Sequence, residues 1–143
     1  MMAWRLCRAP FADLTGEGAR RYGGRWNRPG KPVIYAASSA ALAVLEVRVR
    51  LDLPPELLPD DYVLLTIDLR DLPIEEVIHM PTDPAAFGDE WLRERRSAVL
   101  QVPSVIVPES ANLLFNPAHP DAAGVGIIAQ RRFLFDQRLW LSL

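Results

Sequence analysis

The sequence is poor in the residues that build disulfide frameworks and metal centres. It contains one cysteine, Cys7, and two histidines among 143 residues, so no internal disulfide can form and no His/Cys cluster is available for zinc. A chain of this length buries roughly 68% of the surface that its unfolded form exposes, which gives a hydrophobic core without such cross-links. We therefore expect neither a secreted disulfide scaffold nor a bound metal.

Long hydrophobic runs and an excess of basic charge are also absent. Charged residues interrupt the apolar stretches well before the ~20 residues that a membrane-spanning helix needs, and the Met-Met-Ala-Trp start lacks the pattern of a signal peptide. The formal net charge is −2, whereas domains that coat nucleic acids usually carry a basic excess. The sequence thus predicts a cytoplasmic protein with no membrane contact and no direct nucleic-acid binding.

Proline, by contrast, is abundant, with 13 residues that fall in clusters along the chain. Prolines interrupt helices and central strands, and the apolar segments between the clusters are short. This pattern favours an α+β fold, a single mixed domain over residues 1–143 with short strands and few helices.

Local patterns place the individual elements. Strands are predicted at residues 4–8, 32–37, 62–70, 98–102, 104–107 and 127–141, the last with a short helix as the alternative. Two helices are predicted, one capped by Ser38 or Ser39 and ending near Val49, the other opened by Asp83-Pro84 and ending near Arg96. Residues 15–30, rich in glycine and arginine, follow neither period and predict a structured loop.

The predicted loop carries the segment Gly23-Gly24-Arg25-Trp26-Asn27. Two glycines let the backbone approach a ligand closely, and the Arg25 guanidinium offers a planar fork to phosphate oxygens. The alternative is a plain turn in which Arg25 stacks on Trp26 at the surface. The spacing matches neither a dinucleotide-binding GxGxxG motif nor a P-loop, so we expect no nucleotide site of those two kinds.

Tyr35 and Glu46 flank a predicted strand-to-helix junction, a geometry that can bring both toward one cleft. At 100° per residue, Glu46 falls about 40° from Leu42 and so lies at the edge of the apolar face of the helix. A desolvated carboxylate without a partner costs several kcal/mol, so Glu46 is paired, protonated or functional. The alternative interpretation pairs Glu46 with Arg50 at i+4 and leaves Tyr35 as a core aromatic.

A third candidate cluster follows the predicted strand 104–107 and contains Ser110, Asn112 and His119. Hydroxyl and amide groups at a strand end are well placed to contact a ligand. Ser110 lacks the Gly-x-Ser-x-Gly turn of hydrolase nucleophiles, and a histidine between two prolines more often caps a turn than acts as a base. Cys7 has no CxxC spacing and no nearby histidine, so we interpret it as a core residue.

Together these segments resemble the RES domain, a bacterial family named for its Arg, Glu and Ser and found as the toxin of toxin-antitoxin pairs with an Xre-like antitoxin. The resemblance rests on seven segments in the family's order: Trp4–Arg8, Gly23–Asn27, Val33–Ser38, Ala41–Glu46, Gly88–Leu92, Val102–Ser110 and Asn116–Pro120. Any one of these segments would be weak, whereas seven in order are specific.

The resemblance implies a fold similar to the ADP-ribosyltransferase toxins and an activity that consumes NAD+, either by breaking its nicotinamide–ribose bond or by passing ADP-ribose to a protein. It makes NAD+ the substrate and requires no metal. Carried over by position, the predicted catalytic residues are Glu46, Arg25, Tyr35 and Ser110, and the predicted NAD+-binding residues are Gly24, Arg25, Trp26, Asn27, Tyr35 and Ser110.

The chemistry of these residue types agrees with that expectation. Cleavage of the bond develops positive charge on the ribose, and a fixed carboxylate such as Glu46 stabilises that charge. Arg25 is expected to hold the pyrophosphate, Tyr35 to stack on the nicotinamide or ribose, and Ser110 to hydrogen-bond the ribose or carboxamide. The expected partner is an antitoxin that blocks the cleft. Self-association through apolar C-terminal residues such as Phe133 stays open, as does a higher toxin-antitoxin assembly.

Two other functions compete with this interpretation. The first is a catalytically inactive protein-binding module, in which Glu46 pairs with Arg50 and the cleft only seats a partner. The second, a ribonuclease toxin, is disfavoured by the negative net charge and by the lack of a pair of catalytic histidines. Water, phosphate and a protein side chain all stay open as the acceptor of ADP-ribose.

Overall fold

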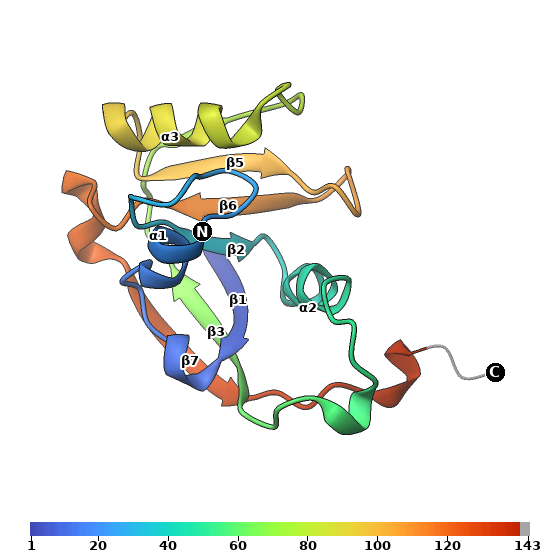
Figure 1. Ribbon diagram of the computed structural model, residues 1–143. Coiled ribbons are helices and arrows are strands. Elements are labelled where there is room, and N and C mark those ends of the chain that lie inside the picture. The colour runs from blue at the N-terminus through green and yellow to red at the C-terminus, as the bar shows by residue number, and fades with distance from the viewer. Residues whose placement is uncertain (141–143) are drawn as a thin grey trace.

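In the computed structural model, which describes residues 1–140, seven strands and three α-helices follow one another along the chain (Figure 1). The strands are β1 (Met2–Arg8), β2 (Ile34–Ala37), β3 (Tyr62–Asp68), β4 (Ile74–Glu76), β5 (Val99–Pro103), β6 (Ala111–Phe115) and β7 (Gly126–Arg132). The helices are α1 (Glu17–Tyr22), α2 (Ala40–Arg48) and α3 (Pro84–Glu94). The predicted α+β architecture of short strands and few helices is confirmed.

The strands form one sheet in the order β4-β5-β6-β2-β1-β3-β7, antiparallel except for the β4–β5 pair. Strand β1 pairs with β3 along its whole length, from Met2 opposite Asp68 to Arg8 opposite Tyr62. It pairs with β2 only where Trp4 lies opposite Ala37. Beyond that point the two strands diverge, and Figure 1 shows β1 running steeply across the direction of β2. The middle of the sheet is therefore its weakest junction.

Two helices cover different parts of this split sheet. Helix α3 lies along β5 and β6 (Figure 1) and buries Trp91 and Leu92 against Leu100 and Leu114. Helix α2 contributes Leu42 and Ala43 to a second cluster, with side chains from β1 and β3. Each large apolar side chain buried in this way stabilises the fold by about 2 kcal/mol. The helices thereby hold both halves of the sheet in place around the β1–β2 junction.

Both predicted helix starts are confirmed. The Ser39 side chain accepts a hydrogen bond from the backbone N–H of Leu42, and the Asp83 side chain accepts one from the N–H of Ala86. Pro84 occupies the first turn of α3, where no intrahelical N–H is required. Because Ser39 fixes the first residue of α2, it also fixes which face of that helix turns toward β1.

Two predictions for the first half of the chain need correction. The predicted loop 15–30 contains helix α1, whose start follows Gly16 at φ +72° and whose Glu17 pairs with Arg20 at 2.8 Å. The helical period could not be detected, because six residues with two apolar positions carry little periodic signal. Strand β4, only three residues long, was missed for the same reason.

The predicted strand 104–107 is wrong. Strand β5 ends at Pro103, and the Ser104 hydroxyl accepts backbone hydrogen bonds from Ile106 and Val107, which closes a turn. Val105 and Ile106 are exposed at 54% and 37% rather than buried in a sheet. A second strand that was not predicted is β6, and its register with β5 makes a hairpin whose connection is residues 104–110.

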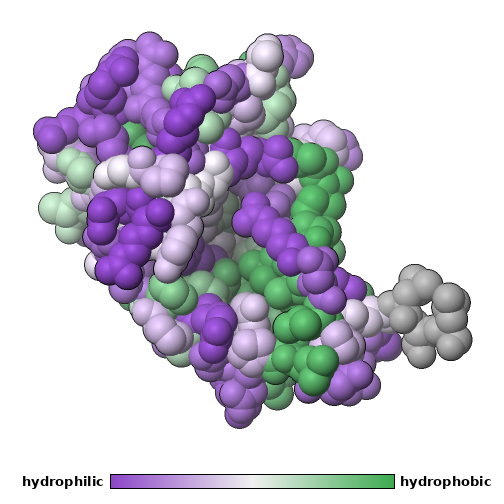
Figure 2. Space-filling view, viewed as in Figure 1, coloured by the Kyte–Doolittle hydropathy of each residue, from purple (hydrophilic) through white to green (hydrophobic). Residues whose placement is uncertain are grey.

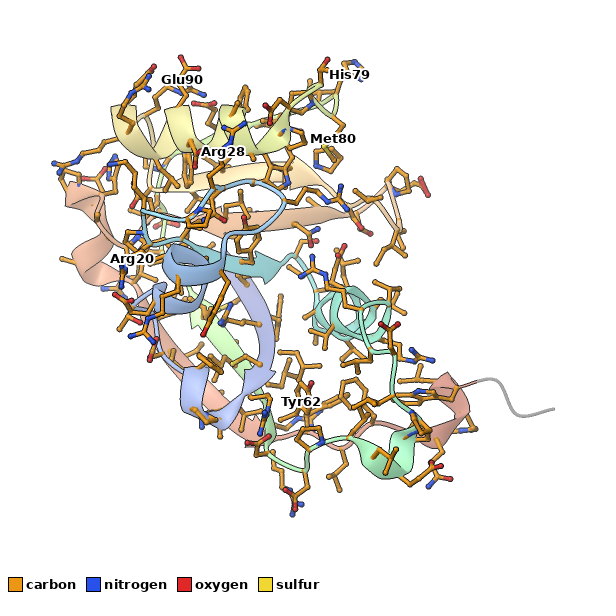
Figure 3. The ribbon with its side chains drawn as sticks, in the orientation of Figure 1. Arg20, Arg28, Tyr62, His79, Met80 and Glu90 are labelled. Carbon is orange, nitrogen blue, oxygen red and sulfur yellow. The ribbon has the colours of Figure 1, made fainter. Side chains whose placement is uncertain are left out.

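The predicted closing strand at residues 127–141 is correct only as far as Arg132, and Leu141 lies outside the described residues. Beyond β7, Phe135 contacts Tyr62, Phe133 and Trp140 in edge-on aromatic pairs with centroids 5.1–5.7 Å apart. Figure 3 labels Tyr62 at the base of the molecule beside this segment. These aromatics close the core cluster beneath α2, so they serve packing in the chain itself.

Candidate functional site

The divergence of β1 and β2 opens a cleft. Four adjoining cavities, of about 590, 130, 200 and 430 Å³, share their lining residues. Arg50 borders all four, Tyr35 and Arg25 border three each, and Glu46 borders two. Figure 2 shows this face hollowed near its centre, with hydrophobic residues along the side where α2 lies. Three of the four predicted catalytic residues, Arg25, Tyr35 and Glu46, therefore meet at one cleft.

The Glu46 carboxylate is held by two side chains of the β5–β6 hairpin. Its Oε1 atom accepts hydrogen bonds from the Ser104 hydroxyl at 2.7 Å and from the Asn112 amide at 3.0 Å. Helix α2 aims Glu46 at the hairpin because Leu42 and Ala43 are buried on the adjacent face of the helix. The carboxylate is fixed in direction while still bordering two cavities.

The alternative pairing of Glu46 with Arg50 is not found. Among residues 1–140, no ion pair joins these two side chains, and Glu46 takes its hydrogen bonds from neutral donors instead. Arg50 lies just beyond the end of α2, where its backbone N–H bonds to the carbonyl of Val47. Arg50 borders the cleft and has no acidic partner at ion-pair distance among the described residues.

Tyr35 is locked by the segment Gly23–Asn27. Its hydroxyl accepts a hydrogen bond from the Trp26 N–H at 3.0 Å and donates one to the Asn27 side-chain oxygen. Burial raises the pKa of Tyr35 to about 12, against smaller opposing effects of the Trp26 hydrogen bond and the positive charge of Arg50. The phenol therefore stays protonated at neutral pH and can serve as a hydrogen-bond donor.

Asn27 and Trp26, which bond to the Tyr35 hydroxyl, are themselves held by buried contacts. Asn27 is 2% exposed, and its amide donates to the carbonyls of Ala19 and Arg28. Trp26 is 3% exposed and packs edge-on against Phe87 of α3. Both were predicted among the NAD+-binding residues, as the supporting wall of the site, and Trp26 borders the same cavity as Glu46.

Glycine is required at two places in the same segment. Gly23 has φ +73°, a left-handed conformation that favours glycine. A Cβ atom added at Gly24 would lie 2.7 Å from the Tyr35 hydroxyl, so only glycine lets the tyrosine approach this closely. Gly24 thus lets the backbone of this segment approach the Tyr35 side chain, next to the Trp26 N–H that bonds to its hydroxyl.

Arg28 ties this segment to helix α3. Its backbone N–H donates to Asp89 at 3.0 Å, and its guanidinium donates to Asp83 at 2.9 Å. Figure 3 shows Arg28 below α3, on the side of the helix that faces the segment. The cleft wall is therefore connected to the α3 layer as well as to β2.

Arginines outnumber carboxylates in the lining of the largest cavity, where Arg21 pairs with Glu17 and Asp13 is the other acidic residue. Arg5 from β1, Arg25 and Arg50 all border the largest cavity, and within residues 1–140 none of them has an acidic partner within ion-pair distance. The Arg5 Nε atom is buried without a hydrogen-bond partner in that part of the chain, although its Nη1 reaches the Tyr35 carbonyl at 3.4 Å. Uncompensated guanidinium groups around one hollow favour a ligand with phosphate groups.

Ser110 stands apart from the other predicted catalytic residues. Its backbone carbonyl accepts from the Ser104 N–H and its N–H donates to Val107, so it closes the hairpin connection. It borders none of the four cavities. Its predicted contact with the substrate stays a prediction that the hairpin geometry does not support, whereas Ser104 contacts Glu46 directly.

The remaining candidates take structural roles. His119 accepts a hydrogen bond from the Asp121 N–H through Nδ1, as expected for a residue that caps a turn. Cys7 is buried, and desolvation raises the pKa of its thiol, which disfavours a reactive thiolate. Within residues 1–140, no group of three or more His, Cys, Asp and Glu side chains could hold a metal ion. No helix in the same range is both long and apolar enough for a membrane span.

Sequence reasoning missed Arg5, Arg50 and Ser104 as members of the site, since Arg50 was considered only as an ion-pair partner of Glu46. Arg5 belongs to the strand segment Trp4–Arg8, where neighbouring apolar residues suggested only a core role. Ser104 was assigned to a strand that does not exist. None of these residues carries a local sequence signal of its place in the site, which only the tertiary structure creates.

The sequence model of the RES domain matches residues 2–136. The "Prs ADP-ribosylating toxin" of Sphingobium sp. (strain YBL2) is 44% identical over 141 residues, which cover 89% of this chain and 86% of that protein. The "Toxin Res" of Pseudomonas putida is 37% identical over 148 residues, which cover 98% of this chain and 100% of that protein.

A third relative links sequence and structure. The "NAD(+) phosphorylase MbcT" of Mycobacterium tuberculosis is 37% identical over 91 residues, which cover 54% of this chain and 48% of that protein. The crystal structure of the M. tuberculosis MbcT-MbcA toxin-antitoxin complex contains a chain of the same fold, with a TM-score of 0.76 and 24% identity over 92% of this chain and 83% of that one. This likeness confirms the predicted fold.

Proposed function

The chain belongs to the RES domain family, and from that premise we propose that it cleaves the nicotinamide–ribose bond of NAD+ as the toxin of a toxin-antitoxin pair. The names of its relatives support the substrate, because one is an ADP-ribosylating toxin and another an NAD(+) phosphorylase. NAD+ is the substrate that both kinds of reaction consume.

One observation carries the proposal: a fixed carboxylate and unpaired arginines border one continuous cleft. Bond cleavage places positive charge on the ribose as nicotinamide leaves, and Glu46 is held in place beside the cavities by two donors before any ligand arrives. A charge that needs no reorganisation stabilises such a state most effectively. Arg25 and Arg50 are suited to bind the pyrophosphate, which would hold the ribose against Glu46.

Tyr35 would orient the nicotinamide ribose. It borders both cavities that Glu46 borders and two of the three cavities that Arg25 borders. Positioning is valuable here because nicotinamide already carries a positive charge in NAD+ and leaves without protonation. Geometry, rather than acid catalysis, then supplies most of the rate gain.

The expected partner is an Xre-like antitoxin that covers the cleft in the cytoplasm. Val49, Val105 and Ile106 are exposed at 56%, 54% and 37%, and all three border the cavity that contains Glu46. An apolar rim around a cavity that also contains charged side chains suits contact with another protein. The same rim would serve a binding module without catalysis, which is the competing function.

Release of free nicotinamide from NAD+ by the purified chain tests the proposal. Replacement of Glu46 by Gln keeps the shape of the side chain but removes its charge, and we expect the rate to fall about a hundredfold or more, equivalent to roughly 3 kcal/mol. The matched control is Glu109→Gln, at an exposed position in the hairpin connection. Equal release by wild type and Glu46→Gln would favour the binding module.

Analysis of the second product identifies the acceptor. Mass spectrometry of reactions with and without added inorganic phosphate, and with and without a bacterial lysate, separates the three acceptors. Free ADP-ribose indicates water, a phosphorylated ADP-ribose indicates phosphate, and a protein adduct indicates a side chain. A reaction that yields none of these products would contradict the proposed bond cleavage.

A further inference from the structure

Both donors that hold Glu46 come from the β5–β6 hairpin. Ser104 follows β5 directly, and Asn112 lies in β6, where it is placed opposite Val102 on one side and Ala37 on the other. Asn112 therefore has neighbours in the sheet that fix its backbone. The Ser104 side chain is fixed by its own burial, since the residue is only 2% exposed.

The hydrogen bonds around Ser104 determine where its proton points. The hydroxyl oxygen accepts from the N–H groups of Ile106 at 3.2 Å and Val107 at 3.1 Å. A hydroxyl has one proton, and the contact at 2.7 Å leaves that proton for Glu46. The turn that residues 104–107 form is thus also the device that orients the hydroxyl.

The two oxygens of Glu46 differ as a result. Oε1 accepts from both Ser104 and Asn112, whereas Oε2 has no hydrogen-bond partner among the residues that the structure describes. Glu46 borders the two cavities that also contain Tyr35 and Arg50. One oxygen is anchored to the protein, and the other is free to face a ligand.

We infer that Ser104 and Asn112 are positioning residues, which hold Oε1 so that Oε2 meets the ribose of NAD+. The inference rests on the proposed function, in which Glu46 stabilises the developing charge. Without these anchors the glutamate side chain must be ordered anew in each reaction, and a small misplacement of a catalytic group is enough to lower the rate about a hundredfold. Neither residue needs to contact NAD+ itself.

The test measures kcat and KM for NAD+ by nicotinamide release. For Ser104→Ala and Asn112→Ala we expect kcat to fall roughly ten- to a hundredfold with KM changed less than about threefold. Ser104→Thr, which keeps the hydroxyl, should recover part of the lost kcat. The double variant should lose less than the product of the two single losses, because both donors act on the same oxygen.

Asn112→Asp separates a loss of activity from a loss of the fold. The aspartate has the shape of the asparagine but offers a second carboxylate to Glu46 in place of a donor, so kcat should fall at least as far as in Asn112→Ala. Ser38→Ala is the matched control, since Ser38 is exposed and its side chain has no hydrogen-bond partner in the described range. Thermal unfolding of each variant reports its fold separately.

The outcomes distinguish this inference from the proposed function. If the wild type releases no nicotinamide, the proposed function itself fails. If the wild type is active and folded Ser104→Ala and Asn112→Asp retain its kcat, the inference is overturned. A loss of kcat in Ser110→Ala with none in Ser104→Ala would likewise overturn it and identify Ser110 as the serine of the site.

Discussion

Replacement of Tyr35 by Phe probes the junction between the glycine segment and β2. The ring stays in place, so apolar burial is conserved, but the hydroxyl that joins Trp26 and Asn27 is lost. This leaves the Trp26 N–H and the Asn27 side-chain oxygen without their partner. Each unsatisfied buried group costs about 1–3 kcal/mol, so the two groups give an expected loss of about 2–6 kcal/mol in the free energy of unfolding.

For a chain of this size, a loss of 1 kcal/mol lowers the unfolding temperature by about 3 °C. Tyr35→Phe should therefore unfold roughly 6–18 °C below the wild type in a calorimetric or fluorescence melt. Tyr22→Phe is the matched control, because Tyr22 is 77% exposed and its hydroxyl has no hydrogen bond within residues 1–140. A shift of less than about 2 °C for Tyr35→Phe would refute the assignment of this hydroxyl as a structural link.

The pH dependence provides a second check on the same residue. The pKa of Tyr35 is raised by burial to about 12, whereas an unfolded tyrosine ionises near 10. The folded state then binds the phenolic proton more tightly, so the stability that this group contributes is fully present below pH 10 and is lost as pH rises toward 12. The stability difference between wild type and Tyr35→Phe should shrink over that interval, and a constant difference would contradict the raised pKa.

Three further predictions address other parts of the molecule. Gly88→Ala would place a Cβ atom 1.7 Å from the Trp26 carbonyl oxygen, so we expect about 3 kcal/mol of destabilisation in urea unfolding; an unchanged midpoint would show that α3 shifts freely. Arg50→Ala should raise KM for NAD+ about tenfold with a smaller effect on kcat, while Arg93→Ala on the exposed side of α3 should change neither; equal KM values would remove Arg50 from the binding site. Phe135→Ala removes the central ring of the C-terminal aromatic cluster and should cost about 2 kcal/mol in the same urea assay; a loss below 0.5 kcal/mol, about the level of a surface substitution, would show that the cluster is loosely packed.

The parts of the fold with strong local signals could be predicted from the sequence. Ser39 and Asp83 mark helix starts through their own side chains, and both caps occur as expected. The position of the β5–β6 hairpin could not be predicted, because Val105 and Ile106 are β-branched residues of the kind that favours strands. They are exposed only because Ser104 closes a turn around them. A high strand propensity means that a residue suits the half-buried surface of a sheet. Whether these two residues are buried, however, depends on the tertiary structure.

The residues of the candidate site also divide into those with a local sequence signal and those that only the fold brings together. Arg25, Tyr35 and Glu46 were found from their positions in short motifs, and the cleft brings them together. Arg5 and Ser104 escaped because their importance depends on distant contacts, with Tyr35 and Glu46 respectively. A single sequence carries no record of which far residues meet, so such members of a site emerge only from the fold.

The attachment of the C-terminal segment to α2 gives residues outside the cleft an influence on it. The Arg48 guanidinium stacks 4.1 Å over Trp140 and donates to the Leu139 carbonyl, so the last described residues brace the helix that carries Glu46. A substitution of Trp140 would leave the residues that line the four cavities unchanged and would still loosen the end of that helix. Distance from the cleft is therefore no sign that a substitution in this segment is neutral.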